Sequence, residues 1–376
     1  MNQKIARFLS ENSPETPCLV VDLDRIGEAY DVLCRYLSIA NVYYAVKANP
    51  APEIVAMLAH KGSNFDVASP AEIALCLGNG ATPDHLSFGN TIKKEKDIAF
   101  AYEAGVRLFA FDSEAELAKL ARQAPGARVF CRILVSCEGA DWPLSRKFGC
   151  TPELAVTLLA DARRLGLDPY GVSFHVGSQQ TDLGQWDRAI GAVARMFTLL
   201  AETDINLRMV NIGGGFPAQY RGTIASIEQY AQAVTDALTR HFGNHLPEII
   251  VEPGRSLVGD AGLIQSEVIL IADKGDGGGK RWVYLDVGKF NGLAETMDEC
   301  IRYRIEAPGR SGPAGPVIIA GPTCDSADIL YERTEYRLPL DLEVGDKVEI
   351  LSTGAYTASY ASVGFNGFPP LRTYCI

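Results

Sequence analysis

Residues 42–68 of the chain read VYYAVKANPAPEIVAMLAHKGSNFDVA and contain the repeating unit on which the predicted fold rests. Residues 42–45 and 65–68 are short apolar runs with the length and composition of buried β-strands. Residues 52–60, between them, carry apolar side chains three and four positions apart, as a helix with one buried face does. The stretch therefore predicts a strand, a helix and a second strand parallel to the first.

The same alternation continues through the first two thirds of the chain. Six further apolar runs occupy residues 86–88, 108–111, 129–133, 171–174, 209–212 and 249–251, and helical spacing recurs at residues 71–77, 114–121, 153–165 and 227–242. The runs begin about twenty residues apart at first and about forty apart later, which leaves room for a helix between neighbours. Eight such units predict the α/β class and a (β/α)8 TIM-like barrel, with an open doubly wound sheet as the alternative.

The pattern changes after Arg255 to extended segments joined by glycine turns. Strands are predicted at residues 267–271, 281–286, 316–320 and 347–351, and the glycines at 277–279 fit a hairpin turn. Residues 18–22 also have the composition of a strand, so both chain ends are expected in one β domain. We therefore expect a barrel domain at residues 20–256 and a β domain formed by residues 1–19 and 257–376.

Composition excludes several classes of function. The 376-residue chain has a net charge of −11, which disfavours a nucleic-acid partner because phosphate binding requires clustered Lys and Arg. Nine scattered cysteines without a CxxC pair indicate neither a zinc site nor a disulfide framework, and they suit a reducing compartment. No apolar stretch approaches the ~20 residues of a membrane span or resembles a leader peptide, so we expect a cytoplasmic protein.

Polar residues follow the predicted barrel strands at the ends that would share one mouth. They are Lys47, Asp66, His175, Ser178, the run Gly213, Gly214 and Gly215, and the run Glu252, Pro253, Gly254 and Arg255. Side chains at the carboxyl ends of barrel strands converge on the active site in enzymes of this architecture. The sequence therefore predicts an active site at this mouth.

The triple glycine at 213–215 lets backbone N–H groups approach an anion without obstruction by a Cβ atom. Loops after the seventh and eighth barrel strands often bind phosphate, and Arg255 could add a fixed positive charge there. A tight turn also needs glycine, and that alternative stays open from the run alone.

Four side chains complete the predicted site. Burial of Lys47 would lower the pKa of its amine and favour imine formation with an aldehyde. Glu252 could pair with a protonated pyridine nitrogen, or merely form an ion pair with Arg255. His175 could cover an aromatic cofactor ring and Asp66 could orient it, although both could equally be hydrogen-bonded core residues. Together these groups predict a site for pyridoxal 5'-phosphate (PLP).

With this pattern the chain resembles the fold-type III, alanine-racemase-like PLP decarboxylases, and among them the ornithine decarboxylases. The resemblance runs from about residue 16 to residue 371. Its motifs are TPCLVVDLD (16–24), YYAVKANP (43–50), FDVASPAEI (65–73), SFHVGS (173–178), NIGGGFP (211–217), VEPGRSLV (251–258), GPTCDSADIL (321–330), GAYT (354–357) and FNGF (365–368).

The resemblance implies a role for each site residue. Lys47 would bind PLP covalently, Glu252 would pair with the pyridine nitrogen, and His175 would stack on the ring. Ser178, Gly213 to Gly215, Arg255 and Tyr356 would bind the phosphate. Glu72 corresponds to an acidic position near the active site of the family.

The resemblance also implies a homodimer with composite active sites. The segment GPTCDSAD would reach the barrel mouth of the other subunit, where Cys324 would protonate Cα after carbon dioxide leaves. Asp325 and Asp298 would bind the distal ammonium group of a small basic amino acid. Without the resemblance, Cys324 reads as an ordinary buried cysteine and Asp298 as a solvated surface acid.

The resemblance leaves the substrate open. Ornithine is the expected substrate, while lysine, which is longer by one methylene, or a dual specificity fits the same residues. Diaminopimelate enzymes usually have Glu where this chain has Asp325, a racemase would need two bases, and a regulator resembling antizyme inhibitors would not need Lys47 and Cys324. Lys289 and Pro143 replace a tyrosine and an arginine of the eukaryotic enzymes, which indicates a bacterial-type branch.

Overall fold

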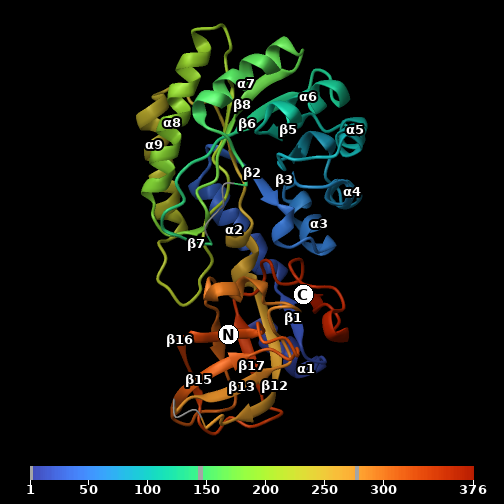
Figure 1. Cartoon of the computed structure of the whole chain (residues 1–376), viewed down its shortest axis with the longest axis vertical. Helices are drawn as coiled ribbons and strands as arrows, with labels where there is room; N and C mark the ends of the chain where they lie inside the picture. Colours follow the sequence, from blue (N-terminus) through green and yellow to red (C-terminus); the bar gives the residue numbers. More distant parts are fainter. Residues whose placement is uncertain (1–2, 143–146, 276–278) are drawn as a thin grey trace. The chain divides into compact units, whose positions relative to one another are not determined.

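The computed structural model describes residues 3–142, 147–275 and 279–376. The chain forms two compact units, each with its own core (Figure 1). The barrel unit comprises Gly27–Pro217 and Ile224–Gly254, and the β unit comprises Met1–Ile26, Ala218–Thr223 and Arg255–Ile376. Pro143 and the glycines at 277 and 278 lie outside the described residues.

Eight strands close into a barrel in which every neighbouring pair is parallel. They are β2 (Ala40–Ala45), β3 (Asn64–Val67), β4 (Leu86–Phe88), β5 (Leu108–Phe111), β6 (Arg128–Arg132), β8 (Asp168–Ser173), β10 (Met209–Asn211) and β11 (Glu248–Val251). Strand β11 pairs with β2 and closes the ring. The predicted (β/α)8 barrel is therefore confirmed, and the open doubly wound sheet is wrong.

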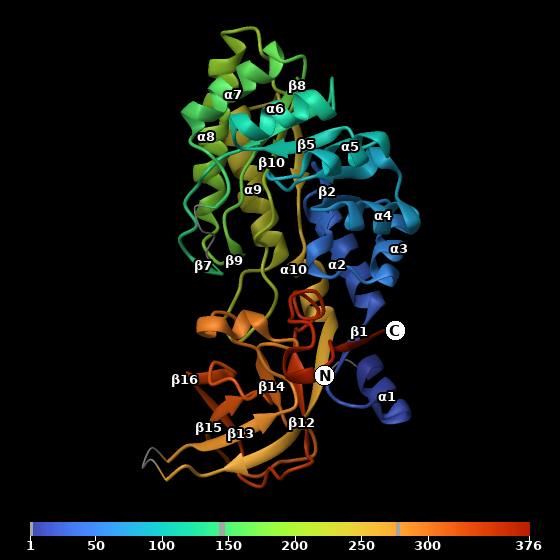
Figure 2. The ribbon, with the colours of Figure 1, turned by 45° about the vertical axis from the view of Figure 1, so that its right-hand side comes forward.

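Helices surround these strands (Figures 1 and 2). They are α2 (Leu23–Tyr36), α3 (Pro52–His60), α4 (Pro70–Gly78), α5 (Glu95–Glu103), α6 (Glu114–Gln123), α7 (Pro152–Arg164), α8 (Gly184–Ala201) and α9 (Ile227–Phe242). Several of these helices begin at a residue whose side chain caps the helix. At the start of α9, the Ser226 hydroxyl accepts a hydrogen bond from the Gln229 N–H, and the Gln229 side chain accepts one from the Ser226 N–H. Inside the barrel, Tyr43, Phe130 and Met209 belong to one buried cluster, as expected of a packed interior.

The β unit contains one mixed sheet of eight strands. They are β1 (Cys18–Val21), β12 (Gly262–Ala272), β13 (Arg281–Leu285), β14 (Arg304–Glu306), β15 (Ala314–Ala320), β16 (Ile329–Pro339), β17 (Lys347–Leu351) and β18 (Arg372–Cys375). Strand β1, from near the start of the chain, pairs with β12 and with β18, from its end. Helix α1 (Gln3–Asn12) packs Ile5 and Leu9 against β1.

Short elements complete the fold. A two-stranded antiparallel sheet joins β7 (Ala140–Trp142) and β9 (Ser178–Gln180), and α10 (Arg255–Val258) begins the longest segment of the β unit. The 3-10 turns are η1 (Val46–Ala48), η2 (Pro83–His85), η3 (Gly259–Ala261), η4 (Ala294–Glu299) and η5 (Phe365–Gly367). Among the described residues, no helix has both the length and the apolar character needed to cross a bilayer.

Candidate active site

Lys47 lies at the barrel mouth, in the turn η1 directly after β2. Its Nζ is 3.6 Å from Asp66 Oδ2 at the end of the neighbouring strand β3. The predicted burial of Lys47 is wrong, because its side chain is 50% exposed. The residue lies in the turn after the strand rather than in the strand itself. The site therefore presents an accessible amine beside a carboxylate.

Asp66 is a buried acid with one oxygen left unpaired. The residue is 6% exposed, and its Oδ1 has no hydrogen-bond partner in the described part of the chain. Burial raises the pKa of this carboxyl, as does the charge of Glu252, whereas Lys47 lowers it. A Cβ atom at Gly89 would lie 1.9 Å from Asp66 Oδ1. Any residue other than glycine at position 89 would therefore collide with this carboxylate. Asp66 is thus an acceptor suited to a group from outside the chain.

His175 presents a neutral ring at the same mouth. Its Nδ1 accepts a hydrogen bond of 3.0 Å from the Gly177 N–H, so the proton of the neutral ring lies on Nε2. Burial lowers the pKa of the imidazole well below its ordinary value, and the charges of Arg132 and Lys47 lower it further. A neutral imidazole can lie on an aromatic ring without bringing a second cation to the site.

Glu252 is held in place by Asn211 from the neighbouring strand. The Asn211 side chain donates from Nδ2 to Glu252 Oε1 at 2.5 Å, and its Oδ1 accepts from the Gly213 N–H at 2.9 Å. The Glu252 N–H donates to the Gly213 carbonyl at 2.8 Å, so the two loops are also joined through their backbones. The carboxylate of Glu252 consequently has a fixed orientation at the end of β11.

The glycine loop at 213–215 is too closely packed for other residues. A Cβ atom would lie 2.4 Å from the Phe174 carbonyl at Gly213, 2.5 Å from the Glu252 carbonyl at Gly214 and 2.6 Å from the Gly177 carbonyl at Gly215. Gly213 and Gly215 also have positive φ angles of 66° and 98°. These contacts explain the glycines as a tight turn, and an anion cradle also needs a loop without Cβ atoms.

Two neighbouring positions support the loop and the lysine. The Gln180 N–H donates to the Gly215 carbonyl at 2.9 Å, which attaches the glycine loop to β9, the strand that begins at Ser178. A Cβ atom at Gly254 would lie 2.9 Å from the Ala48 Cβ, so this glycine lets the end of β11 pack against the turn that carries Lys47.

Arg255 begins the β-unit half of the chain and already has a carboxylate partner. Its two terminal nitrogens bind both oxygens of Glu295 at 2.7 and 2.5 Å, and the Tyr220 hydroxyl accepts a further bond of 2.7 Å. The guanidinium also lies over the Tyr356 ring, 4.9 Å from its centroid. Both members of the Arg255–Glu295 pair are buried. The arginine predicted to pair with Glu252 or with phosphate is thus oriented by Glu295.

Cys324 is an exposed thiol in the β unit, not the buried cysteine that its composition alone would indicate. The Asn366 Oδ1 accepts from the Cys324 N–H at 3.1 Å and from its Sγ at 3.4 Å. Asp325 is exposed, and its Oδ1 accepts from the Ala327 N–H at 2.8 Å. Asp298 is also exposed and has a φ angle of 53° within η4. These three side chains remain accessible to a molecule outside the β unit's core.

Asp328, which sequence reasoning did not single out, fixes the loop that carries Cys324. It is buried, and its two oxygens accept from the Lys289 N–H at 2.8 Å and from the Thr323 hydroxyl at 2.7 Å. A Cβ atom at Gly288 or at Gly321 would lie 2.3 or 2.4 Å, respectively, from Asp328 Oδ1. One buried carboxylate therefore sets the positions of both Lys289 and the cysteine loop.

Three further residues near the predicted groups were missed. Arg132 ends β6, and its charge acts on both Asp66 and His175, while burial lowers the pKa of its own guanidinium. It is the last residue but one of the fifth predicted strand (129–133), so extending the search for polar side chains at strand ends by one residue would have found it. Asn211 precedes the glycine run, and only its partners reveal its importance. Nothing in the sequence marks Glu295 as the partner of Arg255.

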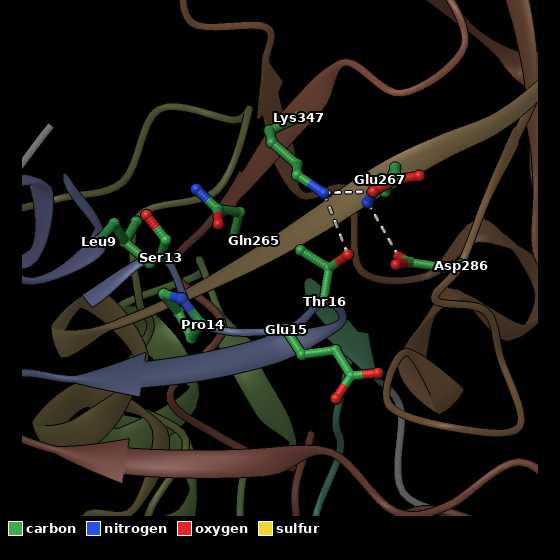
Figure 3. A pocket seen from close by; sticks show the side chains of 9 residues that line it. All are labelled: Leu9, Ser13, Pro14, Glu15, Thr16, Gln265, Glu267, Asp286 and Lys347. Atoms are coloured by element: carbon green, nitrogen blue, oxygen red, sulfur yellow. Dashed lines mark hydrogen bonds and ion pairs between the residues drawn. The ribbon is translucent and has the colours of Figure 1, made fainter. Parts of the chain in front are cut away.

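A cavity separate from these groups lies in the β unit, with a volume of about 640 Å³ (Figure 3). Lys347 forms an ion pair with Glu267 there and donates to Thr16 Oγ1 at 3.4 Å. The cavity is lined by Leu9, Ser13, Pro14, Glu15, Thr16, Gln265, Glu267, Asp286 and Lys347. It contains none of the residues predicted for the active site.

The barrel-mouth residues fit PLP on their chemistry. Lys47 supplies an amine, His175 a neutral ring, Glu252 an oriented carboxylate and Gly213 to Gly215 a bare loop. The unpaired Asp66 Oδ1 is an acceptor that the described chain itself leaves unused. An aldehyde-bearing pyridine with a phosphate has a complementary group for each of them.

Several named proteins are similar in sequence to nearly the whole chain. It is 34% identical over 369 residues to the lysine/ornithine decarboxylase of Selenomonas ruminantium, covering 98% of this chain and 91% of that protein. It is 33% identical to the chloroplastic ornithine decarboxylase of Nicotiana glutinosa, with 94% and 82% covered. Antizyme inhibitor 2 of Xenopus laevis is 32% identical, with 97% and 82% covered.

Solved structures share the fold. The lysine decarboxylase of Selenomonas ruminantium, determined with PLP and cadaverine, superposes with a TM-score of 0.89 at 32% identity, covering 100% of this chain and 94% of that one. The arginine decarboxylase of Paramecium bursaria Chlorella virus gives a TM-score of 0.90 at 26% identity, with both chains fully covered. Residues 23–259 match the family model of the pyridoxal-dependent decarboxylases, pyridoxal binding domain. The chain therefore belongs to the fold-type III, alanine-racemase-like family of PLP-dependent amino-acid decarboxylases.

Proposed function

We propose that this protein decarboxylates L-ornithine to putrescine and carbon dioxide, a reaction that supplies polyamine biosynthesis. The observation that carries the proposal is the ion pair between Lys47 Nζ and Asp66 Oδ2, 3.6 Å apart, at a barrel mouth that also holds Glu252 and His175. It places an accessible amine among the groups that a pyridine cofactor requires.

Each predicted cofactor-binding residue has a distinct task in this reaction. When bound, PLP supplies an electron sink for the pair of electrons left at Cα when the carboxylate departs. Lys47 provides the amine that binds the cofactor aldehyde and later releases the product. Glu252, oriented by Asn211, would pair with the protonated pyridine nitrogen. His175, kept neutral, covers one face of the ring, and the glycine loop with Ser178, Arg255 and Tyr356 binds the phosphate.

The substrate assignment rests on the acids of the β unit. Asp325 and Asp298 are exposed carboxylates on the segments that the family uses for substrate, and a diamino acid brings a distal ammonium group for them. The relatives named above include enzymes for ornithine and lysine. Asp325, where diaminopimelate enzymes usually carry Glu, favours a substrate without a second carboxylate.

A dual lysine/ornithine specificity is the second candidate, because the Selenomonas relative carries that name. One methylene changes binding in an apolar pocket by only ~1–3 kcal/mol, so both substrates can be turned over at one site.

The proposal includes a homodimer with composite sites. Cys324 of one subunit would return a proton to Cα at the barrel mouth of the other, and its thiol proton is held toward Asn366 until then. The nine cysteines, all within the described residues, form no disulfide, which supports a reducing compartment such as the cytoplasm.

The substrate is tested by supplying the PLP-loaded protein with L-ornithine, L-lysine, L-arginine and diaminopimelate separately, and measuring carbon dioxide and amine products. We expect putrescine from ornithine with the highest kcat/KM. A kcat/KM for lysine within about tenfold of that for ornithine would establish dual specificity. The matched control is Lys47→Ala, which removes the amine and should abolish turnover of every substrate.

If the cofactor binds to Lys47 but no substrate is turned over, the proposed reaction is wrong. A regulatory role like that of the antizyme inhibitors would then be the better interpretation.

A further inference from the structure

Asn211 is fully buried, and both polar atoms of its side-chain amide form hydrogen bonds to predicted active-site residues. It ends β10, has an exposed fraction of 0%, and lies between the glycine loop and Glu252. Its Oδ1 accepts from the Gly213 N–H at 2.9 Å, and its Nδ2 donates to Glu252 Oε1 at 2.5 Å. One side chain therefore contacts both the loop proposed for phosphate and the carboxylate proposed for the pyridine nitrogen.

The backbone fixes which way the amide faces. The Gly213 N–H can only donate, so the amide oxygen must face it and the NH2 group must face Glu252. An NH2 group can only donate, so Glu252 Oε1 accepts this bond, which holds the carboxylate in one orientation. The bond is partly buried, and a hydrogen bond to a charged group is stronger there than at the surface.

We propose that Asn211 is a positioning residue that keeps the Glu252 carboxylate oriented and that couples this carboxylate to the first glycine of the phosphate loop. The inference rests on the proposed role of Glu252 as partner of the pyridine nitrogen. It adds a residue that acts on the cofactor through Glu252 rather than by contact.

The same barrel contains a matched control for this interaction. Asn41 Nδ2 donates to Glu248 Oε1 at 3.1 Å, and these residues lie near the amino ends of β2 and β11, at the opposite end of the barrel. This bond is also an amide-to-glutamate bond between neighbouring strands, but it is exposed. Asn41→Asp makes the same chemical change as Asn211→Asp without touching the site.

Asn211→Asp has a pH signature that a purely structural role would not produce. The carboxylate that this substitution introduces would face Glu252 at hydrogen-bond distance, and two buried carboxylates this close share one proton, which raises the pKa of the pair. While that proton is present, the pair keeps one hydrogen bond and one negative charge, as Asn211 and Glu252 do. When it leaves at higher pH, repulsion separates the carboxylates.

Other charged and titratable groups face Glu252 from the surrounding elements. Asp66 on β3, Arg132 on β6 and Tyr43 on β2 interact with the charge of Glu252. Lys47 and His175 belong to the same group of charges through Asp66 and Arg132. All of these groups are unchanged in Asn211→Asp and Asn41→Asp. Their titration therefore contributes equally to the pH dependence measured for each protein.

The experiment measures the dissociation constant of PLP from the apoprotein, the absorption band of bound PLP and kcat, each as a function of pH. It compares wild type with Asn211→Asp, Asn211→Leu, Asn41→Asp and Glu252→Gln. For Asn211→Leu we expect PLP binding weakened roughly 10- to 100-fold at every pH, from loss of a hydrogen bond to a charged group. For Asn211→Asp we expect wild-type behaviour at low pH and a progressive loss as pH rises, with a displaced absorption band.

The outcomes separate this inference from the proposed function. One outcome is that Glu252→Gln changes the absorption band and kcat while both Asn211 variants give the same values as Asn41→Asp. In that case the proposed role of Asn211 is wrong and the proposed role of Glu252 stands. If Glu252→Gln itself behaves as wild type, the proposed role of Glu252 fails. A pH-independent loss in Asn211→Asp equal to that in Asn211→Leu would show a structural role only, and would also overturn the inference.

Discussion

At the scale of single residues, the site depends on atoms that its own chain leaves unsatisfied. Asp66 has one oxygen 3.6 Å from Lys47 and another that is buried without a hydrogen-bond partner in the described chain. An unpaired buried acceptor costs about 1–3 kcal/mol, so its retention indicates a partner that arrives with the cofactor or substrate. Gly89 leaves the space in which this carboxylate lies.

Gly89→Ala tests this arrangement. The new methyl group would lie 1.9 Å from Asp66 Oδ1, so the carboxylate must move away from Lys47 and from the mouth. A displacement of this size at an active site can lower kcat/KM about 100-fold, and we expect a loss of that order together with weaker PLP binding. Gly78→Ala is the control, because a Cβ atom there meets nothing within 4 Å. Unchanged kinetics in Gly89→Ala would contradict the role given to Asp66.

Sequence reasoning could locate residues but not their surroundings. Because barrel topology brings the carboxyl ends of the strands together, the sequence predicted that Lys47, Asp66, His175 and Glu252 lie at one mouth. It could not foresee that Lys47 is half exposed, since that depends on a turn one residue beyond the strand. The partner of Arg255 is forty residues away in Glu295, a pairing that only the folded β unit reveals.

At the scale of elements, the turn η4 is stabilised by one buried acid. Glu299 has a φ angle of 58°, and its carboxylate accepts from the N–H groups of Glu332, Arg333 and Thr334 at 2.9, 2.8 and 2.7 Å. Burial alone would raise its pKa, but these hydrogen bonds outweigh it and lower the pKa to about 2. The turn that carries Asp298 is thereby anchored to β16.

Glu299→Gln should lower the free energy of unfolding by about 1.5–3 kcal/mol at neutral pH, the contribution of hydrogen bonds to a charged group. Because the folded pKa lies below the ordinary 4.5, this contribution is present above pH 4.5 and is lost as the pH falls toward 2. The difference between variant and wild type should therefore shrink over that range in urea unfolding of the apoprotein.

Glu335→Gln, an exposed change on the same strand β16, is the control and should stay within about 0.5 kcal/mol of wild type. A difference for Glu299→Gln that is independent of pH would contradict the ionised role of Glu299.

The elements of the barrel were easier to predict than those of the β sheet. Buried parallel strands are continuous apolar runs, and all eight were found to within a few residues at their ends. In the β unit, β14, β16 and β18 were missed, because β14 and β18 are short and the apolar start of β16 is followed by the polar run ERTE at residues 332–335. Strands with one exposed face give a weaker signal than strands buried on both faces.

At the scale of the whole molecule, the predicted groups divide between the two units. The barrel unit holds Lys47, Asp66, His175 and Glu252, whereas Cys324, Asp325 and Asp298 belong to the β unit. The family resemblance predicts that these halves meet across a dimer, with the β-unit residues serving the partner's barrel. A C2 dimer makes each such contact twice, so two equivalent sites are expected.

This account is tested most directly by a heterodimer of Lys47→Ala and Cys324→Ala subunits, purified through two different tags, with putrescine formation from L-ornithine as the readout. One of its two sites should keep both Lys47 and a partner cysteine, so we predict about half of wild-type activity although each homodimer is inactive or severely impaired. A heterodimer of Lys47→Ala and Glu252→Ala has no intact site and should remain inactive. If the first heterodimer gains no activity over its parent homodimers, Cys324 does not complete the partner's site and the account is contradicted.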